Sequence, residues 1–170
     1  MIPIQCVIDT LFSSLARAEE QLYPNATILP SFPRSIQLDW YTCGAKSTYM
    51  VLRYFGKRCT PSSVEDELGT TYAGTPRTAI KRVLRKHGFR IRVNTDMSLR
   101  DLKSAIHAGS PVIVRLYDGW HYSVVYGYSD RHVFVMNPSL GEMGSVCCAV
   151  RLNEWQRMFD GWGIVVKQPQ

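Results

Sequence analysis

Residues 37–47 have the sequence QLDWYTCGAKS, in which Cys43 stands where a helix is expected to begin. Apolar residues recur at helical spacing from position 49 to position 54, and Gly56 follows as a C-terminal stop. The unpaired amides and the dipole at a helix N-terminus stabilise a thiolate, which makes a cysteine placed there a better nucleophile. The pattern makes Cys43 a candidate nucleophile.

Three further polar residues complete a candidate catalytic set. His121 opens a predicted strand and Asn137 ends the next strand of the same hairpin, so the two side chains are expected to meet at one end of the sheet. A histidine can act as a base and then as an acid near neutral pH, and a neighbouring group can hold its ring in one tautomer. Gln37 is the candidate donor that joins the Cys43 amide at a developing oxyanion.

Each of these residues taken alone has a simpler interpretation. A cysteine at a helix start is more often inert, and a histidine at a strand start is usually packed or exposed. An Asn-Pro pair is usually a turn, and a single glutamine carries no information. Only the joint placement of the four residues favours catalysis.

In the rest of the chain, predicted helices come first and predicted strands second. Helices are expected over residues 60–68, 76–87 and 98–107, with Thr60, Thr75 and Ser98 as N-caps. Strands are expected over residues 111–117, 121–128, 132–136, 145–152 and 163–167, with an edge strand over 89–93 and a short helix over 154–159. This order predicts an α+β fold with a helical half and an antiparallel β-sheet.

The sequence resembles the papain-like peptidase C39 group. The similarity lies in QLDWYTCGAKS with the helix after it, then GSPVIV from Gly109, HYSVVYGY from His121, VFVMNP from Val133, and the closing NEW and WGIVV. The resemblance implies a papain-like cysteine peptidase fold over residues 37–170, preceded by an N-terminal helix and a proline-rich connector in residues 1–36. It also implies that Cys43 is the nucleophile, His121 the general base and acid, and Gln37 an oxyanion-hole donor.

Two positions depart from the pattern of that group. Asn137-Pro138 stands where the group usually has Asp-Pro, so the residue can orient a histidine but cannot stabilise an imidazolium by charge. Ala45-Lys46 replaces the usual Pro-Ala, and Lys46 is expected to be exposed to solvent. No transporter segment follows in this sequence, so the peptidase half of a bacteriocin exporter is not expected.

The predicted function is that of a cysteine peptidase, which cleaves a peptide or amide bond through a Cys-His-Asn triad and a thioester acyl-enzyme. Two alternatives remain open. The same site could serve an acyltransferase or a transglutaminase-like enzyme, or the domain could be a catalytically inactive peptide-binding module. The expected partner is a peptide or protein substrate, no cofactor or metal is expected, and the oligomeric state is left open.

Charge and composition limit the other classes of function. The 170 residues are 45% hydrophobic and 20% charged, in the range of one globular domain. No apolar run is long enough for a membrane span, and no signal peptide is evident, so the protein is expected to be cytoplasmic or exported without a recognisable signal. The net charge of +6 is exceeded by seven basic residues within positions 77–92. A solvated helix face is the favoured interpretation, docking of an acidic substrate is the alternative, and nucleic acid is not expected because aromatic residues are not interleaved.

A few side chains near the candidate site have open roles. Trp120 is expected to shield His121, to line a subsite or to pack into the domain. Asp118 is a reserve orienting group for His121, and Asp39 is expected to cap the helix that Cys43 begins, with contact to the substrate as the alternative. The remaining cysteines Cys59, Cys147 and Cys148 are expected to be small buried hydrophobic residues.

Overall fold

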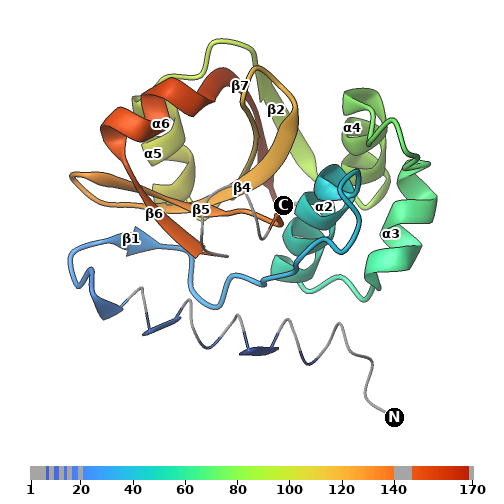
Figure 1. Cartoon of the computed structure of the whole chain (residues 1–170), viewed down its shortest axis with the longest axis horizontal. Coiled ribbons are helices and arrows are strands. Elements are labelled where there is room, and N and C mark those ends of the chain that lie inside the picture. Colours follow the sequence, from blue (N-terminus) through green and yellow to red (C-terminus); the bar gives the residue numbers. More distant parts are fainter. Residues whose placement is uncertain are drawn as a thin grey trace.

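The computed structural model of the chain describes residues 21–139 and 147–168, together with isolated positions between 7 and 18. In chain order its elements are β1 (Thr27–Ile28), α2 (Cys43–Tyr54), α3 (Pro61–Leu68), α4 (Arg77–Lys86), β2 (Arg90–Asn94), α5 (Leu99–His107), β3 (Val112–Leu116), β4 (His121–Tyr128), β5 (His132–Met136), β6 (Cys147–Arg151), α6 (Leu152–Met158) and β7 (Phe159–Lys167). Helices α2, α3 and α4 form one half, and the sheet with α5 and α6 forms the other (Figure 1). The expected α+β fold is confirmed.

The sheet is antiparallel in every described pair. Its strands lie in the order β2-β7-β3-β4-β5-β6, and β1 adds to β4 beside this path. Strands β4 and β5 have the bounds expected from the sequence, and β2 is the expected edge strand. Strand β7 begins at Phe159, earlier than expected, because it continues past a register shift to pair Phe159 with Leu116 of β3.

The caps of the helices explain where they begin. Thr60 and Ser98 cap α3 and α5 as expected, each within a capping box. The prediction that Thr75 caps α4 is wrong. Pro76 takes the N-cap position in an extended conformation, and the Thr75 hydroxyl instead lies 2.9 Å from the Thr70 hydroxyl.

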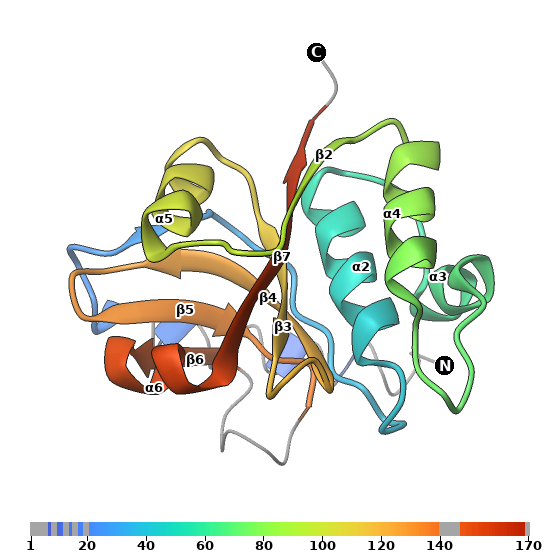
Figure 2. The ribbon, with the colours of Figure 1, turned by 90° about the horizontal axis from the view of Figure 1, so that it is seen from above.

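The basic helix α4 packs as a solvated amphipathic helix. Its apolar stripe, Ala79, Ile80, Val83 and Leu84, is buried, and most of its basic side chains are exposed. Seen from above, α4 lies beside α2, away from α5 and α6 (Figure 2). The favoured interpretation of the basic stretch as a solvated face is therefore confirmed for most of its length.

Of the N-terminal part, the connector packs onto the domain, since Leu29, Phe32 and Ile36 are buried in its core. The N-terminal helix expected within residues 1–36 lies mostly outside the described residues. In the connector that follows, Thr27 and Ile28 pair with Tyr128 and Gly127, a short strand that the sequence analysis missed. The boundary at residue 36 stays a prediction. None of the helices within the described residues is long and apolar enough to cross a membrane.

Candidate active site

Cys43 is the first residue of α2, as predicted. Its side chain is buried, with 7% of its surface exposed. The N-cap residue Thr42 makes no capping bond to the helix, because its hydroxyl donates to the Asp39 carbonyl at 3.0 Å. The prediction that the Asp39 side chain caps α2 is therefore wrong. The first turn of α2 carries no acidic residue and no side-chain cap, so its amides and its dipole act on Cys43.

His121 and Asn137 meet at the end of the sheet where β4 begins and β5 ends. The His121 Nε2 atom lies 2.6 Å from Asn137 Oδ1, and both residues are buried, with 5% and 0% of their surfaces exposed. The Ser139 backbone N–H donates to the same Oδ1 at 2.9 Å, which fixes the orientation of the Asn137 amide. Because Oδ1 can only accept, Nε2 carries the proton of the neutral ring. The lone pair then lies on Nδ1.

A glycine brings the start of α2 against the start of β4. A Cβ atom placed on Gly44 would lie 3.1 Å from a ring atom of Tyr122 and 2.7 Å from the Thr75 Cβ. A side chain at this position would overlap Thr75 and crowd the Tyr122 ring. Since Gly44 follows Cys43 and Tyr122 follows His121, this close approach brings the backbone at Cys43 near the backbone at His121.

Gln37 lies beside the same end of β5. Its backbone N–H donates to the Pro138 carbonyl at 2.8 Å, which ties the segment before Cys43 to the residue after Asn137. Its side-chain Nε2 donates to the Trp40 carbonyl at 3.2 Å, so the amide nitrogen keeps a second N–H for another acceptor. The structure thus brings Gln37 close to Asn137 by way of Pro138.

The turn before His121 has an unusual backbone. Tyr117, Asp118 and Gly119 have φ values of 55°, 54° and 90°, all in the left-handed region. The Arg115 guanidinium supports this turn by donating to the Asp118 carbonyl at 3.4 Å. Asn137, and not Asp118, is the hydrogen-bond partner of the His121 ring. Trp120 is 88% exposed, which excludes the alternative that it packs into the domain and leaves a role at the surface.

The burial of Lys46 differs from the expectation from the sequence, and Tyr122 was not expected to have a role at the site. Lys46 was expected to be exposed, but only 6% of its surface is, and its Nζ lies 3.4 Å from Glu65 Oε1 on α3. The buried ammonium is tolerated because it has this carboxylate partner.

Burial raises the pKa of Tyr122 to about 12, so its phenol stays protonated at neutral pH. The only indication in the sequence that Tyr122 lies at the site is its position directly after His121.

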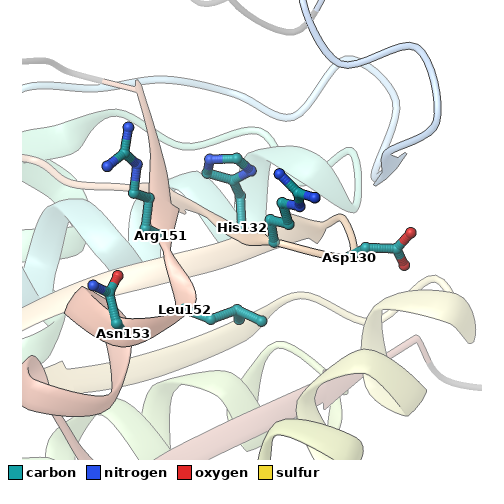
Figure 3. A pocket seen from close by; sticks show the side chains of 6 residues that line it. Asp130, His132, Arg151, Leu152 and Asn153 are labelled. Carbon is teal, nitrogen blue, oxygen red and sulfur yellow. The ribbon is translucent and has the colours of Figure 1, made fainter.

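Two cavities lined by described residues lie away from this site. One of about 430 Å³ opens at the β4–β5 turn, lined by Asp130, Arg131, His132, Arg151, Leu152 and Asn153 (Figure 3). None of these residues is Cys43, His121, Asn137 or Gln37. The described residues contain no group of three or more His, Cys, Asp or Glu side chains arranged to hold a metal ion. Cys59 is half-buried rather than buried, and the side chains of Cys147 and Cys148 lie outside the described residues.

A cysteine at a helix start and a histidine at the start of a strand of an antiparallel sheet form the arrangement expected of a cysteine peptidase. The peptidase C39 family matches residues 31–168, and the chain belongs to this family. The family assignment inferred from the sequence motifs is confirmed, and the protein is a cysteine peptidase of the C39 group.

Known proteins with similar sequences come from archaea and bacteria. An uncharacterized protein of Methanothermobacter thermautotrophicus is 30% identical over 129 residues, which cover 76% of this chain and 84% of that protein. The lactococcin-A transport/processing ATP-binding protein LcnC of Lactococcus lactis is 27% identical over 121 residues, 70% of this chain but only 17% of that protein. The match to LcnC is therefore a match to a small part of a larger protein.

Solved structures share the fold at lower identity. A double glycine motif protease from an AMS/PCAT transporter, in complex with the leader peptide, has a TM-score of 0.68 at 22% identity, with 81% of this chain and 91% of that chain covered. A C39-like peptidase from Bacillus anthracis has a TM-score of 0.68 at 17% identity, with 85% and 99% covered. These likenesses establish that the chain has the fold of these peptidase domains.

Proposed function

We propose that this peptidase hydrolyses a peptide or amide bond, with Cys43 as nucleophile and the His121–Asn137 pair as its general base and acid. The observation that carries this proposal is the buried 2.6 Å contact between His121 Nε2 and Asn137 Oδ1. Because this contact holds the proton on Nε2, Nδ1 is the nitrogen that can take a proton from the nucleophile. Asn137 acts as a positioning residue, because its oxygen holds one tautomer of the ring.

The reaction begins with transfer of the Cys43 proton to His121 Nδ1. The thiolate attacks the scissile carbonyl carbon, and the carbonyl oxygen becomes an oxyanion. The Cys43 backbone N–H and the second N–H of the Gln37 amide donate to this oxygen. When the tetrahedral intermediate collapses, the C–N bond breaks, His121 Nδ1–H protonates the leaving amine, and a thioester remains on Cys43.

Water then releases the acyl group. His121 Nδ1 takes a proton from the water, and the resulting hydroxide attacks the thioester carbonyl within the same two donors. The C–S bond breaks, the proton returns to the cysteine sulfur, and the product leaves as a free acid. An amine in place of this water would give the amide product of an acyltransferase.

A peptide substrate is supported by the surface around the site. Leu38 and Trp40 precede Cys43 and Trp120 precedes His121, and these three large apolar side chains are 62%, 74% and 88% exposed. Exposed apolar groups of this size gathered near one site are typical of a recognition surface for another chain. The transporter protease of the same fold was solved with a leader peptide bound, which also favours a peptide substrate.

The test compares Cys43→Ala with Cys59→Ala, since Cys59 is the other cysteine that forms no disulfide among those that the structure describes. Both variants and the native protein are incubated with a peptide library, and new termini are identified by mass spectrometry. We expect cleavage by the native protein and by Cys59→Ala, and none by Cys43→Ala. Cleavage that persists in Cys43→Ala would exclude Cys43 as the nucleophile.

Two further readouts separate the remaining functions. Added amines that are incorporated into the products, with little free acid, would identify an acyltransferase. A rate of Cys43 alkylation by iodoacetamide no faster than that of free cysteine, together with no cleavage, would identify a peptide-binding module without activity.

A further inference from the structure

Two buried aromatic rings lie on one side of the nucleophile. Tyr122 packs against Gly44, the residue after Cys43, and its ring centroid lies 6.1 Å from that of Trp162 on β7. The two side chains are nearly buried, with 8% and 5% of their surfaces exposed. These two rings, which we call the apolar floor, extend from β4 and β7, and the Tyr122 ring lies against the start of α2.

Two guanidinium groups lie against the Trp162 ring, and only one of them is neutralised. Arg77 and Arg115 have their guanidinium carbons 5.8 Å and 5.9 Å from the ring centroid. Arg115 is paired with Asp160 at 3.5 Å. Arg77 is exposed, and no carboxylate within the described part of the chain lies within ion-pair distance of it.

The position of Arg77 is unfavourable for the helix that carries it. It is the first residue of α4, where the helix dipole disfavours a cation, and none of residues 69–95 is acidic. Other cations of α4 have partners at the far end of the helix, since Lys86 pairs with Glu67 and Arg82 donates to the Glu67 carbonyl. An unpaired cation held at the Trp162 ring is therefore a feature that α4 itself does not require.

We propose that Arg77, with Tyr122 and Trp162 as its floor, forms a subsite for an acidic side chain, Asp or Glu, of the peptide substrate. Contact with the Trp162 ring holds the guanidinium in place while its N–H groups remain available to a carboxylate. Extended peptide advances about 3.3 Å per residue, so the contacts from Arg77 to Gly44 place the acidic residue within about five residues of the scissile bond. This subsite rests on the proposed peptidase function and adds a substrate class to it.

The test is a change of preference within one peptide library. Cleavage sites are mapped for the native protein, Arg77→Gln and Arg77→Glu, and for Arg85→Glu as the matched control on the exposed face of the same helix. A charge-assisted contact to a carboxylate predicts about tenfold enrichment of Asp and Glu at one position in the native protein. We expect this enrichment to be lost in Arg77→Gln, to change to Lys and Arg in Arg77→Glu, and to remain in Arg85→Glu.

Arg77→Glu, which reverses the charge, is expected to fold, because a glutamate in the first turn of a helix is favoured by the dipole. Absence of an acidic preference in the native protein, or its persistence in Arg77→Glu, overturns the proposal. Equal loss in Arg85→Glu also overturns it, because that result would reflect the general charge of α4.

A separate readout applies if the library shows no cleavage at all, a result that contradicts the peptidase function. The rates at which Cys43 reacts with iodoacetate and with iodoacetamide are then compared by mass spectrometry. A fall of the iodoacetate-to-iodoacetamide ratio by several-fold in Arg77→Glu alone supports an anion subsite beside Cys43. An unchanged ratio overturns it.

Discussion

Replacing Asn137 by Asp changes one charge at the His121 ring and removes no hydrogen bond that the described residues make. Asn137 Oδ1 accepts from His121 Nε2–H at 2.6 Å and from the Ser139 amide, and a carboxylate oxygen can accept both. Asn137 Nδ2 is buried without a hydrogen-bond partner among the described residues, so its replacement by oxygen breaks no contact. The variant therefore isolates the effect of charge.

The size of the effect follows from the distance and the burial of this pair. A carboxylate this close to an imidazole stabilises the imidazolium and shifts its titration by about one to three pH units, equivalent to about 1.4–4 kcal/mol. Burial limits screening by salt. The thiolate–imidazolium pair lasts until the imidazolium loses its proton. In Asn137→Asp, the alkaline limb of the pH profile of Cys43 alkylation should therefore move to higher pH by that amount.

The assay is the rate of Cys43 alkylation by iodoacetamide from pH 4 to pH 11, with the modified peptide quantified by mass spectrometry. Asn137→Ala is the companion variant, which leaves the His121 ring N–H without its partner and should narrow the profile. A folded Asn137→Asp protein whose alkaline limb coincides with that of the native protein would refute the coupling of Asn137 to Cys43 through His121.

Three further predictions concern the support of the site and of the fold. Both Gly109 and Gly119 have positive φ, but only a Cβ at Gly119 would displace the Arg115 guanidinium from the Asp118 carbonyl and from Asp160. Gly119→Ala should therefore destabilise the protein by more than the roughly 1 kcal/mol expected of Gly109→Ala and should slow Cys43 alkylation, and equal thermal shifts would contradict this. Ser98→Ala should lose about 1 kcal/mol of stability in denaturant unfolding through loss of the α5 cap, while the exposed Ser104→Ala should not. Burial raises the pKa of Glu67, but hydrogen bonds from Lys86 and His87 outweigh it and hold the pKa below its ordinary value of 4.5. The folded state thus binds this proton less tightly than the unfolded state, so its stabilisation is lost as the pH falls below about 4.5, and Glu67→Gln should flatten the pH dependence of unfolding there.

Local sequence patterns predicted most of the elements because each depends on residues close together in the chain. The bounds of β4 and β5 follow from runs of apolar residues between turn residues, and the capping boxes at Thr60 and Ser98 are four-residue signals. The contact of His121 with Asn137 was predictable for a related reason, since both residues lie in one hairpin and adjacent strands bring its ends together.

The features that were missed depend on contacts between distant segments. Lys46 is buried because α3 packs beside α2 and supplies Glu65, and nothing in the sequence around Lys46 indicates this neighbour. Thr75 fails as a cap because its hydroxyl turns to Thr70 and its side chain packs against Gly44. The exposed position of Trp120 likewise depends on how the turn after β3 leaves the sheet.

The hydrogen bond from the Gln37 backbone N–H to the Pro138 carbonyl has a consequence for when, during synthesis, the enzyme can become active. During synthesis, Cys43 and Gln37 leave the ribosome about a hundred residues before Pro138 does. A growing chain can therefore form α2 while it still lacks the groups that would orient a histidine or fix the Gln37 segment. The proposed catalytic arrangement is completed only after the β4–β5 hairpin and Pro138 have been synthesised and have docked, so chains truncated before Pro138 should carry Cys43 but show no peptidase activity.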